Sequence, residues 1–373
     1  MRITIVDSYY PAFLSYALDK IRAADLGYES MLSRLLGLRF GTADFYSRHL
    51  RELGVEASDI ILNCEPLQQR WAEERGITFD MGTRFQRGMS RLPLVRRWVD
   101  HPNPLTSIAV RQISELRPDV LYIQDLSLFR PSVLRSLKHV VGSIVGQIAS
   151  PLPDEEFLRP FDLILTSFPH YVDRFRAMGI RSEYFRIGFD PIVIEELGSV
   201  QRYRSCTFVG GLSAAHAART RFLEQLARSV DIEFFGYGAE SLDPSSPIVP
   251  RHRGGAWALD MYRVLAESII TVNVHIDVAE NYANNMRLYE ATGCGAMLLT
   301  DKKDNLAELF APGTEVVAYR DAAHAIERIR YYLDHRDEAV AVARAGQVRT
   351  LRDHTYRVRM EELIEILKRQ MRF

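Results

Sequence analysis

The sequence has little cysteine, no long apolar run and almost no net charge. Its three cysteines, Cys64, Cys206 and Cys294, are widely spaced and lie in apolar segments. This excludes a disulfide framework and a zinc-binding spacing, and it predicts buried, reduced thiols. No window approaches the roughly 18 apolar residues of a membrane-spanning helix, and the first apolar run is too short for a signal peptide. We expect a cytoplasmic protein with at most peripheral membrane contact.

Several binding signatures are also missing. Lys and Arg number 47 against 48 Asp and Glu, so the net charge of −1 gives no field that would attract nucleic acid. The loop after the first expected strand (residues 3–6) lacks G-x-G-x-x-G, which argues against a dinucleotide enzyme. Tyr9 and Tyr10 stand there instead, either at the mouth of a cleft or as ordinary packing. No Asp-x-Asp pair lies in a suitable loop, so we expect neither metal nor cofactor.

The chain is long enough for two domains, since 373 residues exceed one ordinary hydrophobic core. Short apolar strands alternate with amphipathic helices along most of its length, which predicts α/β domains with parallel, doubly wound sheets. We place the first domain at residues 1–190 and the second at 204–355. Helical and strand periodicities lapse between about 191 and 204, so we place the interdomain linker there.

The segment 284–301 is the most informative part of the sequence. It predicts a short helix opened by Asn284 and Asn285, closed by glycines, and followed by a strand that ends in Asp301. Arg287 lies in the first turn, where the helix dipole disfavours a cation unless an anion such as phosphate is bound. Glu290 follows on the same face, where its carboxylate can accept both ribose hydroxyls. The alternative is an Arg287–Glu290 ion pair on a solvated face.

A second expected helix N-terminus repeats this pattern. Gly210 and Gly211 lie between a strand and a helix, where they allow close backbone approach to a ligand, and Ser213 can cap the helix. His216 and Arg219 then bring cationic groups into the first turns. Two such helix ends in one domain favour phosphate binding over the ion-pair alternative.

Candidates for acid–base chemistry are weaker. Asp125 follows the strand at 120–123 and can activate an acceptor hydroxyl, or it is a turn acid. His275 follows the strand at 269–274, and Glu280 and His170 are further candidates. Five arginines between Arg84 and Arg97 form either a surface for an anionic acceptor or lipid, or a solvated helix and turn.

The pattern Asn-x-Arg-x-Tyr-Glu-Ala-x-x-Cys-Gly-Ala-x-Leu-Leu-Thr-Asp (residues 285–301) resembles the donor half of GT-B glycosyltransferases, most closely the CgeB-like (spore-maturation-protein-like) group 1 transferases. The resemblance covers roughly residues 205–360. It implies two Rossmann-like domains that face a central cleft, with Glu290 at the donor ribose and Tyr237 near the nucleobase. It also implies that the last helix, about 356–373, packs back on the first domain.

The resemblance implies transfer of a sugar from a nucleotide-sugar donor to an acceptor hydroxyl, without metal and with retention favoured. The sequence departs from the retaining E-x7-E pattern, because Tyr282 occupies the position of the first glutamate. A glycan, a lipid-linked molecule or a protein remains open as acceptor. Two alternatives also remain: a nucleotide-sugar 2-epimerase of the same fold, and a binding protein without catalysis.

Overall fold

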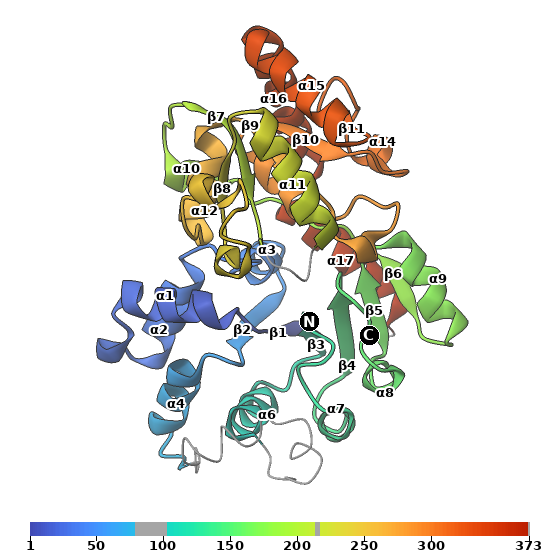
Figure 1. The fold of residues 1–373 in the computed structure, drawn as a ribbon. Coiled ribbons are helices and arrows are strands. Elements are labelled where there is room, and N and C mark those ends of the chain that lie inside the picture. Colours follow the sequence, from blue (N-terminus) through green and yellow to red (C-terminus); the bar gives the residue numbers. More distant parts are fainter. Residues whose placement is uncertain (79–102, 213–216, 372–373) are drawn as a thin grey trace.

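Two parallel sheets organise the protein. The computed structural model describes residues 1–78, 103–212 and 217–371 (Figure 1). The first sheet has the strand order β2-β1-β3-β4-β5-β6 and the second has the order β11-β10-β9-β7-β8, and every strand pair is parallel. The predicted fold class, two α/β units that each have a doubly wound parallel sheet, is therefore confirmed. We call the first sheet with its helices the first layer, and the second sheet with its helices the second layer. The stretch from Arg84 to Arg97 lies outside the described residues.

The strands are short, and those in the sheet centres are fully buried. All four residues of β3 are buried because β1 and β4 flank it and helices cover both faces. The strands of the first sheet are β1 (Arg2–Asp7), β2 (Glu56–Ile61), β3 (Val120–Ile123), β4 (Ser143–Ile148), β5 (Leu163–Thr166) and β6 (Ser182–Tyr184). Those of the second are β7 (Arg204–Val209), β8 (Glu233–Phe235), β9 (Ser268–Asn273), β10 (Met297–Asp301) and β11 (Val317–Tyr319).

Helices connect the strands in both layers. Around the first sheet they are α1 (Pro11–Ile21), α2 (Tyr28–Leu36), α3 (Phe45–Glu52), α4 (Glu65–Glu73), α6 (Pro104–Leu116), α7 (Pro131–Leu137), α8 (Glu155–Leu158) and α9 (Pro169–Ala177). From the linker onward they are α10 (Ile192–Leu197), α11 (Ala217–Ser229), α12 (Ala258–Glu267), α13 (Arg287–Gly293), α14 (Leu306–Leu309), α15 (Ala322–Asp334), α16 (Arg336–Asp353) and α17 (Tyr356–Gln370). Within the described ranges, none of these helices combines the length and apolarity that crossing a membrane requires.

The strand order fixes where ligands can approach. In the second sheet β8 lies on one side of β7 and β9 on the other, so the order in which strands are added to the sheet reverses between β7 and β9. Open parallel sheets bind ligands at such switch points, beyond the carboxyl ends of the strands. The loops after β7, β9 and β10 therefore line the expected site, and Asp7 and Asp125 occupy the corresponding edge of the first sheet after β1 and β3.

The stretch that we place as the interdomain linker contains one helix, α10. Its six residues make fewer than two turns, too few for a 3.6-residue period to show in the sequence. Burial of Val193 and Leu197, four residues apart, holds the helix against its surroundings, and Gly198 ends it with a φ of 64°.

Two chain segments cross between the sheets side by side. Phe189 N donates to His354 O at 2.8 Å, and Tyr356 N donates to Phe189 O at 3.0 Å. After this crossing α17 runs against α3, where the rings of Phe45 and Tyr356 stack with centroids 5.2 Å apart. The C-terminal end therefore lies beside the first sheet (Figure 1).

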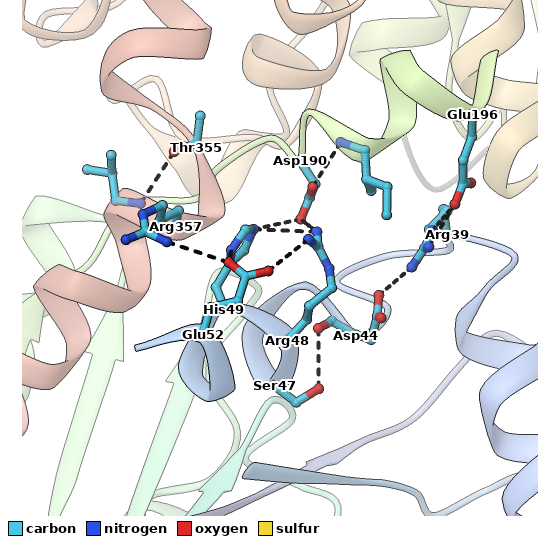
Figure 2. A network of polar contacts seen from close by, with 12 residues as sticks. Arg39, Asp44, Ser47, Arg48, His49, Glu52, Asp190, Glu196, Thr355 and Arg357 are labelled. Atoms are coloured by element: carbon cyan, nitrogen blue, oxygen red, sulfur yellow. Dashed lines mark hydrogen bonds and ion pairs between the residues drawn. The ribbon is translucent and has the colours of Figure 1, made fainter. Parts of the chain in front are cut away.

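A polar network fastens the crossing to α3 (Figure 2). The carboxylate of Asp190, which is 1% exposed, contacts Arg48 and accepts from His49 at 3.0 Å. The other ring nitrogen of His49 lies 2.8 Å from Glu52, which also faces Arg357 of α17. Burial acts to raise the pKa of Asp190, but the hydrogen bonds and the charge of Arg48 outweigh it and hold that pKa below its usual range. The network thus joins the crossing segment to α3 and α17.

Candidate functional site

The predicted helix–strand unit is present as α13 and β10. The two asparagines precede α13 but do not cap it through their side chains, so that part of the prediction is wrong. Asn285 instead exchanges amide hydrogen bonds of 2.6 and 3.2 Å with Asn273 at the end of β9. Asn284 donates to Ser167 Oγ at 3.2 Å, which ties the segment to the first sheet. Both side chains position the start of α13 through long-range contacts.

Arg287 and Glu290 form the ion pair considered as the alternative, with Arg287 Nη1 2.8 Å from Glu290 Oε2. The pair is buried rather than solvated, because the two side chains are only 14% and 7% exposed. Burial raises the pKa of Glu290, and the neighbouring guanidinium opposes that shift. Arg287 Nη1 also lies 3.1 Å from the sulfur of Met261, while its buried Nε has no hydrogen-bond partner. A buried guanidinium with a free donor is suited to an anionic ligand.

The glycine loop after β7 lies beside the side chain of Arg219. Arg219 Nη2 donates to Gly211 O at 2.7 Å, and burial lowers the pKa of this guanidinium. Gly210 N donates to Phe235 O, and a Cβ on Gly236 would lie 2.0 Å from Gly210 O, so the backbones of these two loops touch. The structure thus brings Gly210, Gly211 and Arg219 together. Ser213 and His216 lie outside the described residues.

His275 is held at the switch point by the end of the neighbouring strand. Its Nδ1 lies 2.6 Å from Asp301 Oδ1, and Lys303 Nζ lies 3.2 Å from the other oxygen of that carboxylate. Burial acts to raise the pKa of Asp301, but His275 and Lys303 together lower it. With Nδ1 engaged, His275 Nε2 is buried without a partner. The ring is oriented for one further hydrogen bond.

Glu280 lies apart from the phosphate candidates, at a residue with positive φ (48°) after the short turn Asp277–Ala279. Its half-exposed carboxylate pairs with Arg174 of α9 at 2.6 Å. Tyr282, at the position of the missing glutamate, stacks on His170 with ring centroids 5.1 Å apart. This corner is a contact between the two layers.

Asp125 makes the turn considered as its alternative role. Its Oδ1 accepts from Ser127 N at 2.9 Å and from Ser127 Oγ at 2.7 Å, so one oxygen is engaged in a local turn. Its position at the carboxyl edge of the first sheet nonetheless agrees with the prediction. Its role in catalysis stays a prediction.

Asp7 is a candidate that the sequence reasoning missed. It ends β1, beside Asp125, and its Oδ1 accepts from Ser8 N at 2.7 Å. Burial, and secondarily the charge of Asp125, raise the pKa of Asp7 to about 7. A carboxyl group whose pKa lies near the working pH is suited to general base catalysis. The signal was present in the sequence, because Asp7 follows an apolar strand just as Asp125 does.

Tyr237, predicted near the nucleobase, lies where the two layers meet, because its ring centroid is 5.9 Å from that of Tyr10. We call this place the mouth. Its ring stacks on Trp257 with centroids 5.6 Å apart and an interplanar angle of 7°. A Cβ on Gly211 would lie 3.0 Å from Tyr237 Cζ, so Tyr237 borders the glycine loop. The site therefore runs from Tyr237, past the glycine loop, toward the switch point.

Comparisons with known proteins bear on the family and the fold of the chain. Residues 219–365, less than half of the chain, match the protein family described as glycosyl transferase-like. No curated protein sequence matches the chain.

The whole chain is similar in fold to solved structures. One is the Anabaena protein Alr3699/HepE in complex with UDP-glucose (TM-score 0.59, 13% identity, covering 99% of this chain and 100% of that one). A second is a sucrose-phosphate synthase from Thermosynechococcus elongatus (TM-score 0.59, 12% identity, 99% and 98%). A third is AviGT4, a glycosyltransferase involved in avilamycin A biosynthesis (TM-score 0.56, 14% identity, 99% and 98%). At these identities the likeness is one of fold, and that fold is GT-B.

Proposed function

We propose that this GT-B protein is a glycosyltransferase that moves a sugar from a nucleotide-sugar donor to an acceptor hydroxyl. One observation carries the proposal. The glycosyl transferase-like match at 219–365 falls on the segment that holds Arg287, Glu290 and His275 around a switch point. A buried guanidinium, a buried carboxylate and a glycine loop at such a point suit a nucleoside diphosphate.

We propose UDP as the nucleotide, supported by the UDP-glucose bound to the similar fold of Alr3699/HepE. Arg287 and Arg219 bind the diphosphate, with Asn285, Gly210, Gly211 and Ser213 forming the surrounding backbone and amide contacts. Glu290 accepts hydrogen bonds from the ribose hydroxyls. Without ligand, Arg287 and Glu290 satisfy each other across 2.8 Å. Donor binding exchanges this pair for phosphate on the guanidinium and ribose on the carboxylate, so neither buried charge is left unpaired.

The reaction needs charge stabilisation for the departing diphosphate. We propose that Arg287 and Arg219 supply it, so that the enzyme works without a metal ion. The bond from the anomeric carbon to the diphosphate oxygen breaks, and its electron pair leaves with UDP. The acceptor oxygen forms the new bond to that carbon and gives up its proton.

We propose that the acceptor binds on the first sheet's side of the mouth, where Asp7 accepts a hydrogen bond from its hydroxyl. Asp7 is preferred over Asp125 because burial and the charge of Asp125 raise the pKa of Asp7 to about 7, which suits a general base. Retention, which the sequence resemblance favours, passes the proton to the departing phosphate, and inversion would pass it to Asp7. His275 and Glu280 remain secondary candidates, and the free Nε2 of His275 fits a hydroxyl of the transferred sugar.

The compartment follows from the cysteines. Cys64, Cys206 and Cys294 are all buried and unpaired in the structure. Free thiols are typical of a reducing environment. We therefore propose a cytoplasmic location.

A thermal-shift panel tests the proposal at the level of binding. UDP, GDP, CDP, dTDP and ADP, each alone and as common sugar conjugates, are added with EDTA to exclude metal. We expect UDP and UDP-sugars to raise the melting temperature, because a ligand at 100 times its dissociation constant adds about 2.7 kcal/mol to the free energy of unfolding. A panel without any response would contradict the proposal, and a response only with added Mg²⁺ would contradict metal independence.

A further inference from the structure

Two of the most exposed aromatic side chains meet across the mouth between the layers. Among the described residues, the exposed aromatics are Tyr10 (56%), Tyr203 (60%) and Tyr237 (46%). Tyr10 comes from the loop after β1 and Tyr237 from the loop after β8, yet their ring centroids are 5.9 Å apart at 58°. Large exposed rings from two separate layers that converge in this way need an explanation beyond packing, because each leaves apolar surface in water.

The ring of Tyr237 is held in place by packing on Trp257. One face of it stacks on Trp257 at 5.6 Å, and Tyr10 lies 6.3 Å from Trp257. Phe40 of the first layer supports both, at 5.8 Å from Tyr10 and 5.8 Å from Trp257, and it stacks on the fully buried Phe13 at 3.8 Å. The positions of Tyr10 and Tyr237 are therefore set by packing on the half-buried rings of Phe40 and Trp257, while Tyr10 and Tyr237 themselves stay exposed.

Helix α12 relates these rings to the proposed donor site. Trp257 directly precedes α12, and Met261 stands four residues later, one turn or about 5–6 Å along the same face. The sulfur of Met261 lies 3.1 Å from Arg287 Nη1, and the hydroxyl of the next residue, Tyr262, lies 3.5 Å from Glu290. The start of α12 thus links the aromatic rings, through Trp257, to the Arg287–Glu290 pair, through Met261, about one helical turn away. That spacing suits a base followed by a ribose.

We infer that Tyr10, Tyr237 and Trp257 form a clamp for the nucleobase of the donor, in which Tyr10 is the contribution of the first layer. This inference rests on the proposed function and adds to it a residue that couples donor binding to the placement of the two layers. A base stacked on an aromatic side chain contributes about 1–3 kcal/mol. In this clamp the base stacks on the ring of Tyr237 and contacts the ring of Tyr10, so both layers bind the same ligand.

The test compares UDP binding to the wild type and to Tyr10→Ala by isothermal titration calorimetry. We expect Tyr10→Ala to weaken UDP binding about 5- to 150-fold, the equivalent of losing one stacking contact. Tyr10→Phe keeps the ring and should stay close to the wild type. Tyr203→Ala is the matched control, since it removes an equally exposed tyrosine that pairs only with Arg204 and Glu267. Inorganic pyrophosphate, which has no base, should bind the wild type and Tyr10→Ala equally.

The outcomes separate this inference from the proposed function. If the wild type binds UDP and Tyr10→Ala binds it equally well, the clamp is overturned while the transferase proposal stands. If Tyr10→Ala impairs only the acceptor's KM, the rings hold the acceptor and the inference is again wrong. A wild type that binds neither UDP nor pyrophosphate would overturn the proposed function and the clamp with it. Because Tyr10 is mostly exposed, an unchanged melting temperature of Tyr10→Ala is expected and confirms that the fold is intact.

Discussion

Replacing Asp7 with asparagine is expected to lower the rate of sugar transfer by about 100-fold or more, while UDP affinity stays unchanged. The reason is the loss of the carboxylate that accepts a hydrogen bond from the acceptor hydroxyl, whereas the residues proposed to bind the diphosphate and the ribose lie in the other layer. Initial rates of UDP formation and calorimetric UDP binding, measured on the same preparation, give the two quantities. Asparagine preserves the size of the side chain and its acceptor oxygen toward Ser8 N, so the loop after β1 is retained.

The pH dependence of this variant carries a second signature. Because burial and Asp125 raise the pKa of Asp7 to about 7, the active carboxylate is lost as the pH falls through that value, and the wild-type rate should fall with it. In Asp7→Asn the rate should no longer fall as the pH decreases through about 7. A raised carboxyl pKa also means that the ionised form costs stability above pH 7, so the variant should be more stable than the wild type at pH 8. The fold is therefore testable independently of activity.

Asp125→Asn is the control that separates the two assignments. Its Oδ1 can still accept from Ser127, so the turn is kept, and transfer should remain near the wild-type rate. If Asp125→Asn abolishes transfer and Asp7→Asn does not, the assignment made from the sequence is correct and Asp7 is wrong. The anomeric configuration of the product, read by proton NMR, then decides whether the proton passes to the phosphate or to the protein.

The double substitution of Arg287→Met with Glu290→Gln is expected to weaken UDP binding about 30-fold or more, since loss of a buried charge contact costs about 2 kcal/mol or more. The two residues are changed together because Arg287→Met alone leaves a buried carboxylate without its partner, which destabilises the fold by about 3–5 kcal/mol. Glutamine keeps the size of the glutamate side chain and removes its charge, so the double variant leaves no buried carboxylate without a partner. Titration calorimetry with UDP measures the effect, and urea unfolding measures the stability.

Arg204→Met is a matched control in the same layer. Arg204 is 17% exposed and pairs with Glu233 and Glu267 at 2.6 and 2.9 Å, so its loss disturbs a partly buried ion pair outside the proposed site. It should lower stability without changing UDP affinity. Equal losses of UDP affinity in both variants would show that the effect is general destabilisation, and would remove Arg287 and Glu290 from the donor site.

Local patterns predicted the layers and the helix–strand unit at the site. The apolar run of β10 and the glycines before it are contiguous in sequence, so the elements α13 and β10 could be found there. The buried environment of Arg287 could not be predicted from the sequence. Six of the seven residues of α13 are buried, including Glu290, because the helix is enclosed on all sides. A seven-residue helix is too short for its periodicity to show which face meets water.

Contacts between distant segments explain the other differences. Asn285 was expected to cap a helix, but its partner Asn273 is set by strand order. Tyr10 and Tyr237 are separated by more than half of the sequence, and only the packing of the two layers brings their rings together. Asp7 was visible at a strand end, but its raised pKa depends on burial that three-dimensional packing creates.

The measurement that tests the central claim most directly is UDP release from a panel of UDP-sugars in the absence of acceptor. A transferase activates its donor, and water can replace the missing acceptor, so we predict slow UDP release from one UDP-sugar, abolished in the Arg287→Met, Glu290→Gln variant. Tight UDP binding with no release from any UDP-sugar would contradict the account and identify the chain as a nucleotide-binding protein without catalysis.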